Sequence, residues 1–101
     1  MRQTSGIVIN DDIFINSSNV VKMDKDQQEG TIEVKNNGET KREKVPIYGI
    51  KIYMTHNETP ISFYVYTESE RNAIFNKIIM EMYGNNYAII KFTPYKELDA
   101  K

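Results

Sequence analysis

The feature that most constrains the fold of this chain is a change in the spacing of its apolar residues. Between residues 50 and 66 apolar and polar side chains alternate, so that one side carries Ile50, Ile52, Met54, Ile61, Phe63 and Val65. From Ile74 onward the apolar positions follow the helical period instead. A strand pair followed by an amphipathic helix predicts a sheet covered by that helix, because neither element can bury its apolar side alone.

The helix is predicted to run from Glu68 to Tyr83. Thr67 fits the N-cap position, and Glu70 completes a capping box three residues later. Gly84 suits the position just after the last helical residue. The expected apolar stripe consists of Ile74, Phe75, Ile78, Ile79, Met82 and Tyr83.

Short segments rich in β-branched residues predict more strands, at residues 7–9, 13–15, 20–23 and 31–35. Asn36-Asn37-Gly38 indicates a hairpin turn, after which residues 39–45 form a charged arm that Pro46 is expected to end. The polar stretch from Asp24 to Gly30 is predicted to be a loop, and residues 87–92 a last strand. The predicted fold class is α+β, a curved antiparallel sheet of about six to seven strands with one amphipathic helix packed on it near the C-terminus, followed by a final strand.

Length and composition narrow the class of protein. A chain of 101 residues fits a single domain, residues 1–101, in which residues 94–101 are expected to form a flexible tail. The absence of cysteine excludes disulfide scaffolds, thiolate catalysis and cysteine-based metal sites. Neither a signal peptide nor an apolar stretch of membrane-spanning length is recognised, so a cytoplasmic protein without membrane contact is expected.

The hairpin at residues 50–66 followed by the capped helix at residues 68–83 resembles small pleckstrin-homology-like domains. That fold usually ends with its helix, whereas here Tyr87 to Phe92 continues as a strand. Ile, Asn, Lys and Tyr are abundant, which indicates an AT-rich genome, and with the small size this resembles accessory proteins of phages and mobile elements. The resemblance implies a protein that binds and blocks a host component.

Residues able to perform catalysis are scarce in this chain. The only histidine, His56, lies in a predicted turn, and no nucleophile elbow, phosphate-binding loop or set of zinc ligands is found. We therefore expect no enzyme activity, no cofactor and no metal site.

The expected binding residues lie on the sheet. If the aliphatic side chains of the alternating strands face the helix, then Tyr53, Tyr64 and Tyr66 share the opposite face, where tyrosine is suited to an interface. The charged arm adds Lys41, Arg42 and Lys44. Two plainer interpretations remain, namely N-terminal strands that cover the tyrosines and an arm charged only to prevent strand aggregation.

These residues support a non-catalytic intracellular interaction protein that binds a protein partner or itself, in its most concrete form a phage- or mobile-element-encoded inhibitor of a host protein. The first alternative is a small anionic ligand or nucleotide bound between protomers by Lys51, Arg42 or Arg71. The second is single-stranded nucleic acid stacked on the tyrosines, which a formal net charge of −1 disfavours.

Overall fold

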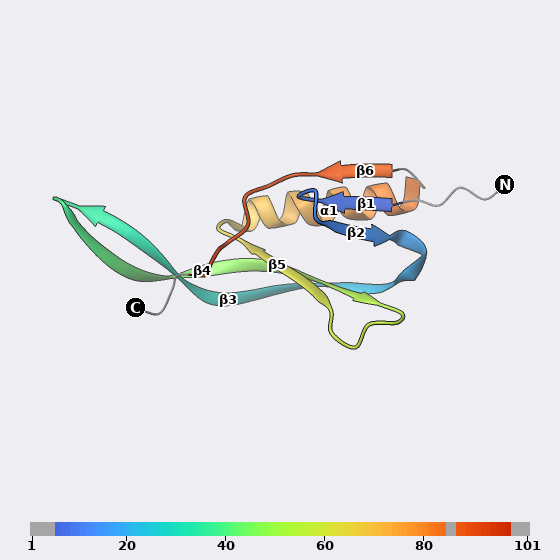
Figure 1. The fold of residues 1–101 in the computed structure, drawn as a ribbon, viewed down its shortest axis with the longest axis horizontal. Coiled ribbons are helices and arrows are strands. Elements are labelled where there is room, and N and C mark those ends of the chain that lie inside the picture. The colour runs from blue at the N-terminus through green and yellow to red at the C-terminus, as the bar shows by residue number, and fades with distance from the viewer. Residues whose placement is uncertain (1–5, 85–86, 98–101) are drawn as a thin grey trace.

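The computed structural model describes residues 6–84 and 87–97, and Figure 1 shows how the helix and the strands are arranged. The elements in chain order are β1 Gly6–Ile9, β2 Ile13–Asn16, a 3₁₀ turn at Ser17–Asn19, β3 Val20–Asn36, β4 Glu39–Met54, β5 Ile61–Val65, α1 Glu68–Gly84 and β6 Tyr87–Ile90. The α+β class is confirmed, as is a single helix followed by a short strand in the described residues.

The strands form two three-stranded sheets instead of the single predicted sheet. Their orders are β2-β1-β6 and β3-β4-β5, and β1 pairs with β6 in parallel while the other pairs are antiparallel. The chain leaves the first sheet at the 3₁₀ turn, where the Asn16 side chain accepts a hydrogen bond from the Ser18 amide at 3.1 Å. The chain returns to the first sheet only after α1, when β6 pairs with the edge of β1 that lies opposite β2.

The hairpin of β3 and β4 is longer than predicted. β3 runs without a break through Asp24 to Gly30, so the predicted loop there is wrong, because pairing with β4 outweighs the low strand propensity of these polar residues. Pro46 also lies inside β4 and does not end it. In a two-residue hairpin turn the flanking residues, here Asn36 and Glu39, form a hydrogen-bonded pair, and such pairs recur at every second position of the ladder. Pro46 falls between two of these positions, so its nitrogen points away from β3. Its missing N–H therefore costs the ladder nothing.

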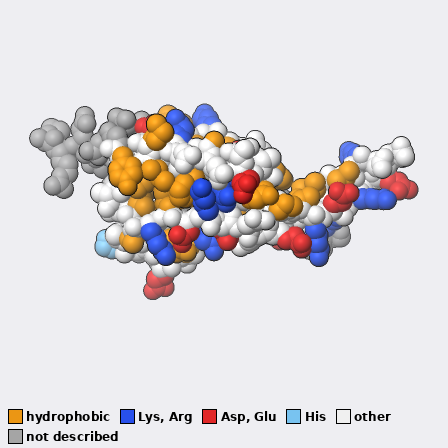
Figure 2. Space-filling view, turned by 180° about the vertical axis from the view of Figure 1, so that it is seen from behind, with side chains coloured by type: hydrophobic (Ala, Val, Ile, Leu, Met, Phe, Trp, Pro, Cys, Tyr) orange, Lys and Arg blue, Asp and Glu red, His pale blue; other side chains and the backbone are white. Residues whose placement is uncertain are grey.

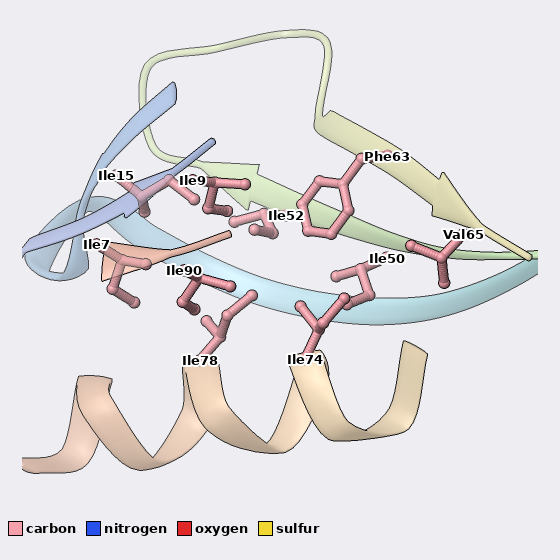
Figure 3. Packing of buried hydrophobic residues seen from close by; sticks show 10 residues of the cluster. All are labelled: Ile7, Ile9, Ile15, Ile50, Ile52, Phe63, Val65, Ile74, Ile78 and Ile90. Carbon is pink, nitrogen blue, oxygen red and sulfur yellow. The ribbon is translucent and has the colours of Figure 1, made fainter. Parts of the chain in front are cut away.

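One core joins the two sheets and α1, and it is built mainly of isoleucine. In Figure 3 the helix residues Ile74 and Ile78 point toward side chains of both sheets. The alternation predicted for residues 50–66 is confirmed, because β4 and β5 direct their aliphatic side chains into this core. The members of the core cluster are Ile7, Ile9, Ile15, Ile50, Ile52, Phe63, Val65, Ile74, Ile78 and Ile90.

The Thr67 half of the predicted capping box is confirmed. The Glu70 amide donates to Thr67 Oγ1 at 3.2 Å, which satisfies a donor that has no partner within the first helical turn. Gly84 is the last residue of the helix and not the residue after it. The predicted stripe is wrong at its end, because Tyr83 is 88% exposed.

The segment after β6 packs against the second sheet. The Phe92 ring lies 5.1 Å from the ring of Phe63, and the Tyr95 amide donates to the Tyr64 carbonyl at 2.6 Å. The Tyr95 hydroxyl accepts from the Thr31 amide at 3.0 Å. Tyr95, the second residue of the expected flexible tail 94–101, is thus anchored, while residues 98–101 lie outside the described residues.

Candidate interaction surface

The most unusual part of the molecule is the outer half of the β3–β4 hairpin, residues 31–44, which we call the arm. It projects from the body in Figure 1 and contributes to a molecule that measures 61 × 25 × 21 Å. Its tip is the Asn37-Gly38 turn, where both residues have positive φ, 54° and 80°. Two consecutive positive φ values are what a type I′ hairpin turn requires, so the local sequence accounts for the tip.

The two faces of the arm differ in chemistry, because residues directly opposite each other in the ladder share a face. One face carries Ile32 and Val34 opposite Glu43 and Lys41. Figure 2 shows hydrophobic side chains continuing from the body onto the arm. The other face is polar and carries Thr31, Glu33 and Lys35 opposite Lys44, Arg42 and Thr40. The candidates Arg42 and Lys44 therefore share a face, and Lys41 lies on the opposite one.

The two long edges of the arm also differ. The hydrogen-bonding pattern set by the turn directs the backbone groups of Thr31, Glu33 and Lys35 away from β4. The Tyr95 hydroxyl takes up the Thr31 amide, but no hydrogen bond from the rest of the described chain reaches the backbone of Glu33 or Lys35 across this edge. On the β4 side the edge of the arm carries Arg42 and Lys44, and Pro46, which blocks strand addition, lies two residues beyond the arm.

The three candidate tyrosines are placed on the side of the sheet predicted for them or next to it, but each has a neighbour within the chain. The Lys22 ammonium lies 4.7 Å from the centre of the Tyr53 ring, and the Tyr66 ring packs on Tyr95 at 5.7 Å. Tyr66 remains 42% exposed. The C-terminal segment around Tyr95 partly covers this face.

Tyr64 is the most constrained of the three. Its ring lies flat over Gly49, where a Cβ atom would overlap it, and its hydroxyl donates to Asp26 Oδ2. Burial, together with the hydrogen bond to Asp26, raises the pKa of Tyr64 from 10.0 to about 12. The same hydrogen bond is the main reason that the pKa of Asp26 is below its usual 3.8. At neutral pH the pair is thus a protonated phenol bound to a carboxylate, an arrangement that positions the ring.

The basic residues of the small-ligand alternative do not form one site. Lys51 Nζ lies 3.9 Å from Asp26 Oδ2. Arg71, only 7% exposed, donates from Nη1 to the Asp26 carbonyl at 3.0 Å and to the Gly49 carbonyl at 3.4 Å. Arg42 lies apart from both, on the arm. Lys51 and Arg71 therefore bind groups in the middle of the β3–β4 ladder, a role that the sequence pattern did not indicate.

A groove of about 330 Å³ separates α1 from the beginning of β3. Its apolar lining includes Met23, Phe75, Ile79 and Met82, three of which belong to the predicted helical stripe. Ser17 Oγ, buried beside it, has no hydrogen-bond partner among the described residues. The stripe thus serves the core through Ile74 and Ile78 and lines this groove with its remaining members.

His56 lies exposed in the turn between β4 and β5. Within residues 6–84 and 87–97 no three His, Cys, Asp or Glu side chains lie close enough together to hold a metal ion. No helix in the same residues has the length and apolar character needed to cross a membrane.

Comparison with known proteins found no matching family model, curated protein or solved structure.

Proposed function

We propose that this chain is a non-catalytic interaction protein that binds a protein partner through the arm. The observation that carries the proposal is that the arm extends as paired strands beyond the core. None of the buried hydrophobic residues of the described chain lies within residues 31–44. The arm therefore contributes no residue to the buried core and touches the body through Thr31 at its base, yet its sequence specifies a defined turn and two distinct faces.

Maintaining such an arm costs free energy. Ordering a backbone residue costs roughly 1–2 kcal/mol, and an isolated two-stranded hairpin is marginally stable in water. The fold could be completed by closing the hairpin near the Gly30–Val45 pair, since β5 pairs only with residues 48–52 of β4. A partner that packs on the arm would offset the cost of ordering it, and this supports a binding role.

The arm offers a protein partner two kinds of contact. Ile32 and Val34 supply apolar area on one face, while Arg42 and Lys44 supply positive charge on the other. Exposed strand edges add backbone hydrogen bonds, the usual source of affinity when a strand is added to a sheet. We assign Lys41, Arg42 and Lys44 to this surface and give Tyr53, Tyr64 and Tyr66 a secondary part, because the tyrosines lie on the body and not on the projecting arm.

In its most specific form, the proposal is an inhibitor encoded by a phage or mobile element that acts in the cytoplasm and covers a surface of a host protein. Small size and AT-rich composition support this form. A projecting arm is also suited to blocking a partner's surface without any chemistry of its own.

The test is to shorten the arm without disturbing the body. Replacing residues 33–42 by Asn-Gly would close the hairpin at the Ile32–Glu43 pair, which has the same hydrogen-bonding pattern as Asn36–Glu39 and leaves the contact between Thr31 and Tyr95 intact. The full chain and the shortened variant serve as baits in lysate of the native host. We expect the full chain to capture a defined protein that the shortened variant loses, with the thermal midpoint nearly unchanged.

Tyr83→Ser is the matched control, because it removes an exposed aromatic ring far along the chain from the arm. It should retain the captured protein. Equal capture by the full chain and the shortened variant would refute binding through the arm.

A further inference from the structure

We infer that the outer edge of β3 in the arm pairs antiparallel with the same edge of a second copy of this chain, about a two-fold axis at Val34. This inference rests on the proposed role of the arm and names its first partner. It depends on three features of the arm, which are the direction of its backbone groups, the difference between its edges and the order of its charges.

The direction of the backbone groups selects the residues that can pair. Glu33 and Lys35 point their N–H and C=O groups away from β4, whereas Ile32 and Val34 use theirs within the hairpin. A strand added along β3 must therefore form its hydrogen-bonded pairs with Glu33 and Lys35. Tyr95 closes the edge at Thr31, so the accessible stretch begins just beyond that residue.

The difference between the edges selects β3 over β4. Within the arm, the residues of β4 whose backbone groups point outward include the basic residues Arg42 and Lys44 and no acidic one, so two copies of that edge would bring like charges together. The outer edge of β3 has no proline between Thr31 and Asn36. It presents alternating Thr, Ile, Glu, Val and Lys, a pattern suited to pairing.

The order of the charges selects a second copy as the partner strand. In a two-fold antiparallel pair centred on Val34, Glu33 lies directly opposite Lys35 of the second copy, and Lys35 opposite its Glu33. Both are hydrogen-bonded pairs in this register, and opposite charges at directly paired positions are favourable. The neighbouring register centred on Glu33 would place two glutamates opposite each other. The sequence Glu-Val-Lys is thus complementary to itself in one register only.

The resulting contact would join the two arms into a four-stranded sheet. Val34 would meet Val34 of the second copy on the apolar face, with both Ile32 side chains on the same face. The β4 residues Lys41, Arg42 and Lys44 would lie on the outer strands of this sheet, away from the new contact. Such a short edge contact is small, and we expect reversible association.

Charge reversal with complementary mixing tests the inference on the full chain. Mass is measured by sedimentation equilibrium from about 1 µM to about 1 mM, a range in which small interfaces dissociate. We expect the wild type to dimerise. Glu33→Lys and Lys35→Glu alone should each weaken the dimer by about tenfold or more, since each turns two attractive pairs into repulsive ones.

Mixing the two variants restores both ion pairs and should give a heterodimer as strong as the wild-type dimer. Glu33→Lys also places a positive charge opposite Arg42 in its own arm, but mixing would not repair that local effect. Glu39→Lys, at the tip on β4, and Lys91→Glu, beside Asp11 after β6, carry the same charge changes away from the β3 edge and should leave the dimer intact.

A wild type that stays monomeric throughout the concentration range overturns the inference, as does a dimer that neither reversal weakens or that mixing fails to restore. If the wild type is monomeric while shortening of the arm still abolishes capture from lysate, the proposed function stands and only the self-pairing is refuted. If the wild type dimerises as expected but shortening leaves capture unchanged, the reverse holds.

Discussion

Replacing Gly49 by alanine would place a Cβ atom on Cδ2, Cε2 and Cζ of the Tyr64 ring, the last at 2.9 Å. The backbone of Gly49 has no positive φ, so the substitution strains only the contact with the ring. Forcing an extra carbon into a packed contact costs about 1–3 kcal/mol. The ring must also move away from Asp26, which loses its hydrogen bond. We expect Gly49→Ala to lower the free energy of unfolding by about 2 kcal/mol.

A double-mutant cycle identifies the cause of this loss. Tyr64→Ala removes the ring, so Gly49→Ala in that background should cost less than about 0.5 kcal/mol, or even stabilise the strand, since alanine limits the unfolded chain more than glycine does. The four proteins are compared by urea denaturation monitored by circular dichroism, with the slopes checked for equality. An equal cost of Gly49→Ala in both backgrounds would show that the ring is not what excludes a side chain at position 49.

Three further predictions concern the same part of the molecule. The free energy of unfolding should fall as the pH rises from 10 toward about 12, because Tyr64 keeps its proton in the folded protein over this range and loses it in the unfolded chain. Urea titrations at a series of pH values measure this fall, which Tyr64→Phe should make shallower. Gly38→Val forces a β-branched residue into a positive φ of 80°, so amide exchange at the arm tip should accelerate while the thermal midpoint holds, and an unchanged exchange rate would contradict the turn assignment. Arg71→Met removes a buried donor to the Asp26 and Gly49 carbonyls and should cost about 1–3 kcal/mol in urea denaturation, whereas an unchanged midpoint would mean that water replaces the guanidinium.

Local signals in the sequence were sufficient for the helix, its cap, the tip of the arm and the inward face of the strands around His56. Each depends on residues a few positions apart, such as Thr67 with Glu70 or Asn37 with Gly38. The continuous β3 strand was missed because Asp24 to Gly30 has weak strand propensity and is held by β4 residues that lie 15 (Gly30 with Val45) to 27 (Asp24 with Lys51) positions away.

The candidate site was predictable only in part. The basic residues of the arm were recognised from composition and from the turn that precedes them. The roles of Tyr64 and Tyr95 were not, because each depends on a glycine of a distant strand, Gly49 or Gly30, that leaves room for an aromatic ring. A glycine within a strand is the signal that indicates such a close approach.

The parallel pairing of β1 with β6 joins the first and last strands of the described chain. During translation β1 leaves the ribosome long before the residues that complete its sheet, so Ile7 and Ile9 must wait with one side unpaired until Tyr87–Ile90 has been synthesised. Contacts so distant along the chain form slowly and late. The nascent protein therefore passes through a stage in which its hairpin can already form while its hydrophobic centre is still incomplete, and a chaperone would be most useful to it at that stage.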